Sequence, residues 1–196
     1  MEKIAQYDDD EGLALEAALA VIEKRGLRLP SNLELDKRLA SDEWRKEKEM
    51  YPCWSGTLIA YKARGKPLGA AIEFEGLKVK VPRKWQAKKN VALVCDHPRF
   101  SFKDNEFSSK NFLLIPFPEK SGWFLPDAAF GIPNGEPDSS RNSKARYLWR
   151  SSGDYVGLLV RGYVLFFGDD RRNVGAGGGP RLRFGVFGVE KSRGRD

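Results

Sequence analysis

The chain has 196 residues, of which 41% are hydrophobic and 12% aromatic, enough to bury a full hydrophobic core. Its net charge is +7, and the excess positive charge lies after residue 140, where 12 basic and 5 acidic residues occur. This composition excludes an intrinsically disordered chain, and the lack of an apolar run of about 18 residues excludes a membrane-spanning helix. We therefore expect a soluble protein without membrane insertion, and the acidic start of the chain is unlike a signal peptide.

The N-terminal part of the chain predicts two helices. Apolar residues recur at helical spacing before a basic pair and Gly26, a common C-terminal stop, and this pattern predicts a helix over residues 11–25. Ser31 stands three residues before Glu34, an arrangement that satisfies two backbone donors at a helix start. It predicts a second helix over residues 32–48.

The middle of the chain predicts short strands separated by long loops. Residues 77–81 alternate apolar and basic side chains directly after the turn candidate Glu75–Gly76, as in a β-hairpin. Comparable apolar runs occur at residues 57–63, 69–74, 91–95, 112–117, 163–167 and 184–189. The elements predict an α+β fold, with two N-terminal helices packed on small antiparallel sheets with long loops. We expect a single domain over residues 1–196, with a helical part (1–50), framework strands and loops (51–148), a ligand-binding region (149–189) and a basic tail (190–196).

The residue pattern argues against catalysis and against a metal centre. The only histidine, His97, lies near Cys95, but one histidine and two cysteines fall short of the four ligands of a structural zinc site. We expect Cys53 and Cys95 to be buried free thiols. The chain has no Gly-x-x-x-x-Gly-Lys-Ser/Thr phosphate loop and no Gly-x-Ser-x-Gly nucleophile motif, and residues 175–179 are expected to form a flexible glycine loop. This pattern predicts a protein that is not an enzyme and binds no metal or cofactor.

Residues 135–138, Gly-Glu-Pro-Asp, are similar to the calcium loop of C-type lectins, where a Glu-Pro-Asn or Gln-Pro-Asp element ligates calcium and sugar hydroxyls together. Those lectins also carry a Trp-Asn-Asp element and paired cysteines. This chain has Trp-Arg-Ser at residues 149–151 and no cysteine after Cys95. A polar turn is the favoured interpretation, and calcium binding by Glu136 and Asp138 stays an alternative.

Residues 150–189 have an unusual composition. These 40 residues contain no Lys, Glu, Gln, Met or Trp, although the five types make up 38 of residues 1–149. At that frequency about ten would be expected. The five types are those that codons of the form NNC cannot encode, so a segment whose AAC codons are randomised at adenine never gains them. The composition therefore indicates template-directed, adenine-specific mutagenesis.

The same segment resembles the end of the C-type-lectin-fold variable proteins of diversity-generating retroelements. The likeness rests on Tyr-Leu-Trp-Arg-Ser-Ser at residues 147–152, Tyr-Val-Leu-Phe-Phe at 163–167 and Arg-Phe-Gly-Val-Phe at 183–187. In that family a Tyr-Leu-Trp-Ser-Ser core element precedes a hypervariable loop, an alternating strand, a second variable loop and a closing strand. The first 140 residues lack the family's Gly-Gly-x-Trp run. The resemblance therefore implies a divergent, archaeal or viral branch.

The resemblance implies that a hypervariable face of the domain binds a macromolecular ligand, expected to be a protein. It also implies a core framework made of Trp149, Tyr163, Leu165, Phe167, Gly185 and Phe187. The expected contact residues are Asp154, Tyr155, Val156, Leu158, Val160, Arg161, Val164, Phe166, Asp169, Asp170, Arg171, Arg172, Ala176 and Gly178. The alternative interpretation is an ordinary buried strand at residues 156–160 and a solvated turn at residues 169–172.

Other functions fit parts of the sequence. Ten arginines after residue 140, together with nearby aromatic residues, suit a basic nucleic-acid-binding module, although no nucleic-acid-binding motif is present. The formylglycine-generating oxidases share the lectin-like fold but bind copper through cysteines near the chain end, and this chain has none after Cys95. The favoured interpretation is a receptor-type ligand-binding protein; nucleic-acid binding is the first alternative and calcium-dependent carbohydrate binding the second. Display on a cell surface would need another signal or a partner.

Overall fold

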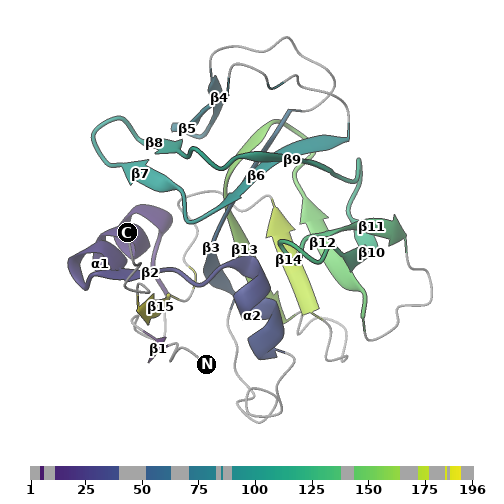
Figure 1. Cartoon of the computed structure of the whole chain (residues 1–196), viewed down its shortest axis with the longest axis horizontal. Helices are drawn as coiled ribbons and strands as arrows, with labels where there is room; N and C mark the ends of the chain where they lie inside the picture. Colours follow the sequence, from purple (N-terminus) through teal and green to yellow (C-terminus); the bar gives the residue numbers. More distant parts are fainter. Residues whose placement is uncertain are drawn as a thin grey trace.

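The computed structural model describes residues 5–6, 12–39, 52–62, 71–82, 85, 90–137, 144–163, 172–176, 184 and 186–190 (Figure 1). Within these residues, two helices and 15 strands form a mixed structure of the broad α+β class, as the sequence predicts. The elements are β1 (Ala5–Gln6), α1 (Leu15–Lys24), β2 (Leu27–Arg28), α2 (Asn32–Leu39), β3 (Cys53–Tyr61), β4 (Ala71–Phe74), β5 (Leu77–Lys80), β6 (Val91–Asp96), β7 (Arg99–Ser101), β8 (Glu106–Ser108), β9 (Leu113–Pro116), β10 (Gly122–Pro126), β11 (Pro133–Pro137), β12 (Arg146–Arg150), β13 (Tyr155–Tyr163), β14 (Arg172–Ala176) and β15 (Phe187–Glu190).

Both predicted helices are present, with shorter bounds. Helix α1 begins at Leu15 rather than at residue 11, because Leu13 is held in an extended bridge to Phe184 by two backbone hydrogen bonds of 2.9 and 3.0 Å. The capping box of α2 is confirmed: the Ser31 N–H donates to the Glu34 carboxylate (2.6 Å), and the Glu34 N–H donates to the Ser31 hydroxyl (3.2 Å). The predicted extension of this helix to residue 48 lies outside the described residues.

The strands form three sheets (Figure 1). The largest has eight strands in the order β11-β10-β12-β14-β13-β3-β6-β9; a second sheet has the order β4-β5-β8-β7, and a third joins the two ends of the chain as β1-β15-β2. Most neighbouring strands are antiparallel, but β14 runs parallel to β12 and β8 parallel to β5. The predicted Glu75–Gly76 turn is confirmed, since Phe74 pairs with Leu77 across two residues of positive φ.

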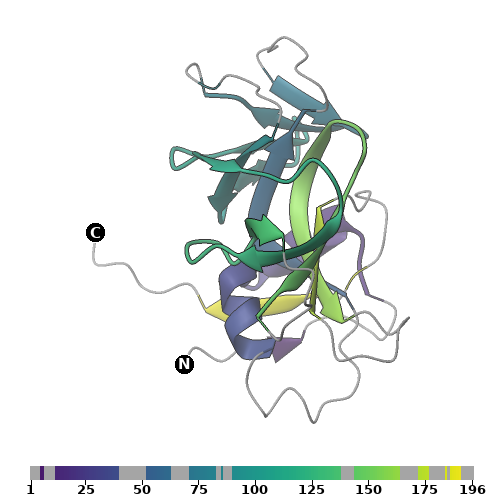
Figure 2. The same ribbon diagram turned by 90° about the vertical axis from the view of Figure 1, so that its right-hand side faces the viewer.

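The eight-stranded sheet carries a hydrophobic core on each face. On one face, side chains such as Trp54 and Leu158 pack against α1 and the four-stranded sheet, and Leu15 and Phe107 belong to this core. On the other face, Leu148 and its neighbours form a second core. Members of the second core are Ile59, Tyr61, Ala92, Val94, Phe117, Phe130, Ile132, Leu148, Tyr155, Leu159 and Val174. Figure 2 shows β13 beside β3. Residues of β13 belong to both cores, Leu158 to the first and Leu159 to the second, so this strand is covered on both faces.

Both cysteines are buried and free, as predicted. Burial raises the pKa of the Cys95 thiol to about 12. A thiol that stays protonated at neutral pH is a poor metal ligand, because the thiolate is the form that binds. Among the described residues, no helix is both long and apolar enough to cross a membrane.

Candidate functional site

Three aromatic side chains form a ladder on the outer side of β10 and β12. Tyr147 and Trp149 alternate along β12 with the buried Leu148, and Trp123 of β10 pairs with Tyr147 across the sheet. The ring centroids lie 5.3 Å apart for Trp123 and Tyr147, and 5.1 Å apart for Tyr147 and Trp149. Trp149 is 51% exposed, although its size favours burial. We call Trp123, Tyr147 and Trp149 the aromatic surface.

At the end of β12 near Trp149, the inward side chain is that of Arg150, and several contacts hold it in place. The Arg150 guanidinium lies over the rings of Tyr61 and Phe117, 4.7 and 5.5 Å from their centroids, and donates to the Glu119 carbonyl. The hydroxyl of Tyr61 accepts a hydrogen bond of 3.0 Å from the Ser151 N–H. Burial raises the pKa of Tyr61 to about 12, despite the nearby Arg150 charge, so the phenol stays protonated.

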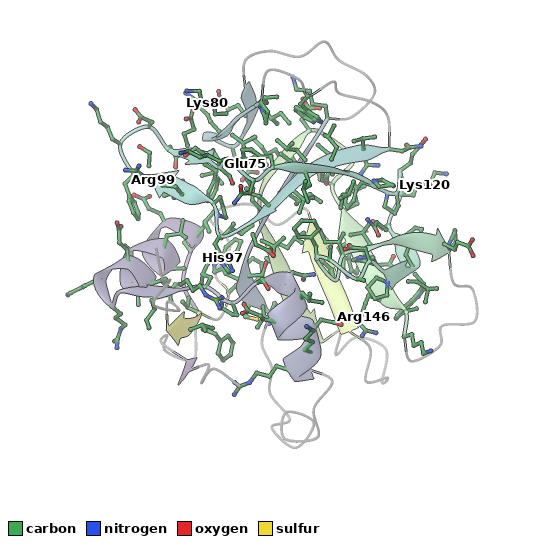
Figure 3. The ribbon with its side chains drawn as sticks, viewed as in Figure 1. Glu75, Lys80, His97, Arg99, Lys120 and Arg146 are labelled. Carbon is green, nitrogen blue, oxygen red and sulfur yellow. The ribbon has the colours of Figure 1, made fainter. Side chains whose placement is uncertain are left out.

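The other end of β12 is fixed by a buried ion pair. Arg146 donates to both carboxylate oxygens of Asp36 in α2, at 2.7 and 3.1 Å, and to the carbonyls of Lys144 and Ala145. Figure 3 labels Arg146 beside α2. Arginines thus anchor both ends of this strand on its inward side, and they hold in the sheet the backbone that carries the outward rings of Tyr147 and Trp149.

Strand β14 borders the aromatic surface directly, and it belongs to the segment of unusual composition, residues 150–189. In the parallel register of β12 and β14, Asn173 lies beside Tyr147 and Gly175 beside Trp149, while Val174 is buried beside Leu148. Gly175 has no side chain to cover the neighbouring indole. Two predicted contact residues, Arg172 and Ala176, form the ends of this strand. The segment singled out by composition thus supplies one margin of the aromatic surface.

Four predicted contact residues are not available at the surface. Tyr155, Val156, Leu158 and Val160 are buried, since β13 is a central strand hydrogen-bonded to β3 and β14. The sequence analysis counts these four residues among the expected ligand contacts, and its alternative of an ordinary buried strand at residues 156–160 is the one that the structure bears out. The cause is the position of β13 between two cores, which an apolar run alone does not reveal.

The remaining predicted contact residues are divided between the described and undescribed parts of the chain. Asp154 is partly exposed just before β13, and the backbone of Arg161 pairs with Cys53 and Val174 inside the sheet. The predicted contacts that lie outside the described residues are Val164, Phe166, Asp169, Asp170, Arg171 and Gly178. Part of the predicted glycine loop, residues 177–179, also lies outside them.

The predicted core framework needs one correction. Trp149 is half-exposed, because the inward positions of β12 are taken by Arg146, Leu148 and Arg150. Phe187 is partly buried, whereas Leu165, Phe167 and Gly185 lie outside the described residues. Sequence reasoning did not single out Trp123 or Tyr147 as surface residues. The available signal was the alternation of Tyr147 and Trp149 around an apolar residue, which two inward arginines made ambiguous.

No metal site is formed by the described residues. They contain no group of three or more His, Cys, Asp or Glu side chains placed to hold an ion. Glu136 is exposed on β11, and Asp138 lies outside the described residues.

The comparisons with protein families, with curated proteins and with solved structures gave no match.

Proposed function

We propose that this chain is a ligand-binding protein whose contact surface combines the aromatic surface with the segment of unusual composition, residues 150–189. The observation that carries the proposal is the half-exposed Trp149, which meets the Tyr147 ring edge to face and is bordered by β14 of that segment. Aromatic side chains on a rigid strand are typical anchors of protein interfaces, because they bury a large area at little cost in conformational entropy. The ligand is a macromolecule, of which a protein is the favoured kind.

The finer parts of the proposal rest on the sequence. The missing residue types support diversification by adenine-directed mutagenesis, and the motifs at residues 147–152, 163–167 and 183–187 support a C-type-lectin-like fold. The third motif ends at Phe187, where strand β15 begins, and the resemblance expects a closing strand in this part of the chain. A framework held by buried cores would tolerate change at its margin, which is the physical requirement for diversification.

The test of diversification is genetic. We expect an adjacent reverse-transcriptase gene and a near-copy of the codons for residues 150–189 that differs mainly at adenines. Among variants of the gene, substitutions should spare buried positions such as Val156, Leu159 and Val174, since polar replacements there would unfold the sheet. If neither the near-copy nor the reverse transcriptase is found, diversification is rejected and only ligand binding is kept.

The nucleic-acid alternative has a separate test. Two of the ten C-terminal arginines that suggested it, Arg146 and Arg150, are engaged by protein groups on the inward side of β12. We therefore expect weak binding to random single-stranded oligonucleotides even at low salt. Tight binding that falls steeply between about 50 and 200 mM salt would favour the basic module instead.

A further inference from the structure

A cavity of about 340 Å³ opens between α1 and the strands β2 and β7. Its apolar wall includes Leu19 and Ile22 from α1, Phe100 and Phe102 from the β7–β8 hairpin, and Leu158 of β13. The two phenylalanine rings meet edge to face, 5.1 Å between centroids. The volume is at the lower end of the range of small-molecule pockets, about 300–1,000 Å³.

One wall of the cavity is built around His97, whose backbone has a positive φ of 50°. This conformation is uncommon for a residue with a side chain. It is held because the His97 N–H donates to the Gly56 carbonyl at 2.6 Å. A Cβ at Gly56 would lie 2.7 Å from the Leu29 carbonyl oxygen and 2.8 Å from Nδ1 of His97, so only glycine lets the ring sit there. Such locally constrained positions gather at ligand sites.

Charged side chains of both signs line the cavity. Arg28 is matched by Glu34, which accepts two hydrogen bonds of 2.7 Å from its guanidinium. Glu23 of α1 and Arg99 of β7 also line the cavity, and neither side chain forms an ion pair or a hydrogen bond with another described residue. A cavity of mixed polar and apolar lining thus carries the exposed carboxylate of Glu23 and the exposed guanidinium of Arg99, neither of which is matched by another described residue.

We propose that this cavity binds a small zwitterion with an apolar side chain, of the class of free α-amino acids. Arg99 would receive the carboxylate, Glu23 the ammonium group, and the leucine and phenylalanine side chains the apolar part of the ligand. Both charges of such a ligand are complementary to groups that the described protein leaves unmatched. The site is separate from the aromatic surface: α1 and β7 lie at the left of Figure 1, and β10 and β12 at the right. Figure 3 labels Arg99 and His97 on the α1 side.

The test uses the whole chain and L-phenylalanine as the probe. Amide and imidazole signals of isotopically labelled protein are followed by NMR during titration. We expect saturable shifts at His97 and along α1 and β7. Phenylacetate, which lacks the ammonium group, and phenethylamine, which lacks the carboxylate, should each bind about fivefold more weakly, as for loss of one partly solvated charge pair.

Variants separate the two charged contacts. Glu23→Gln should weaken L-phenylalanine about fivefold but leave phenylacetate unchanged, and Arg99→Gln should weaken L-phenylalanine and phenylacetate alike. Glu16→Gln on the same helix and Lys103→Gln in the same hairpin are exposed charge-matched controls that do not line the cavity, and they should bind like the unaltered chain. The proposal is overturned if L-phenylalanine shifts no signal around the cavity. It is equally overturned if Glu23→Gln and Arg99→Gln bind as well as their controls.

Discussion

The guanidinium of Arg150 lies 4.7 Å from the ring centroid of Tyr61, on the side of β12 that faces away from Trp149. A strand that alternates large side chains therefore places its cations inward and its aromatic rings outward. This inverts the usual arrangement, and it is possible because Arg146 pairs with the Asp36 carboxylate and Arg150 lies over the Tyr61 ring. The result is a rigid strand with an apolar outer side.

Replacement of Trp149 by alanine should separate binding from stability. Because the indole is half-exposed, the variant should lose less than about 1.5 kcal/mol of unfolding free energy, mainly from its contact with Tyr147. Leu148→Ala, one residue earlier but buried, should lose about 2–5 kcal/mol. Urea unfolding followed by fluorescence and circular dichroism measures both. Equal losses in the two variants would show that the indole is part of the core.

Removal of one partner of the ion pair between Asp36 and Arg146 should lower the unfolding free energy strongly. Asp36→Ala removes the carboxylate that faces the buried Arg146 guanidinium, and we expect it to lower the unfolding free energy by about 3 kcal/mol. The double replacement Asp36→Leu with Arg146→Met removes both charges and should be less destabilised than Asp36→Ala. A double-mutant cycle in urea measures the coupling, and additive losses would contradict it.

Glu34 should make stability depend on pH in the acid range. Its hydrogen bond to Arg28 lowers its pKa from 4.5 to about 2, so the folded chain favours the carboxylate more than the unfolded chain does. This contribution is present above about pH 4.5 and is lost as the pH falls towards 2. Glu34→Gln should therefore melt at a lower temperature than the unaltered chain at pH 7, and the difference should shrink between pH 4.5 and 2. A difference that stays constant between pH 4.5 and 2 would contradict this assignment.

The imidazole of His97, the only histidine in the sequence, can be titrated directly. Loss of water around the His97 ring and the neighbouring Arg28 charge lower the pKa of the imidazole below its ordinary value of 6.5. The neutral ring is favoured by folding, so this group's contribution to stability declines as the pH falls below 6.5 and through the folded-state pKa. NMR titration of the ring proton should give a midpoint below 6.5 in the folded chain and close to about 6.5 in urea. A folded midpoint at or above that of the unfolded chain would contradict this assignment.

Local features of the fold were predictable from the sequence, because they depend on residues close together in the chain. The Ser31–Glu34 capping box and the Glu75–Gly76 turn are set by hydrogen bonds or dihedral angles within four residues. The buried sides of Leu77 and Val79 follow from strict alternation. Each of these sequence patterns is typical of one local structure.

The placement of strands could not be predicted in the same way. Val156 and Leu158 have the composition of either an apolar loop or a buried strand, and only their pairing with Ala60 and Leu58 of β3, about 100 residues away, decides between the two. Trp149 was expected inside because aromatic residues favour cores, but the inward positions of β12 depend on Asp36 and Tyr61, far away in the chain. Long-range partners therefore decide which predicted contact residues reach the surface.

The order of β12, β14 and β13 has a consequence for how the protein is made. Strands β12 and β13 follow one another in the chain but are not neighbours in the sheet. The later strand β14 lies between them and pairs with β12 on one side and β13 on the other. A ribosome must therefore translate past residue 176 before the middle of the sheet can close. A frameshift or early stop before residue 176 would leave an edge of β12 and an edge of β13 unpaired, and we expect proteases to degrade such a product. The middle of the sheet therefore forms only in chains that have been translated correctly at least to the end of β14.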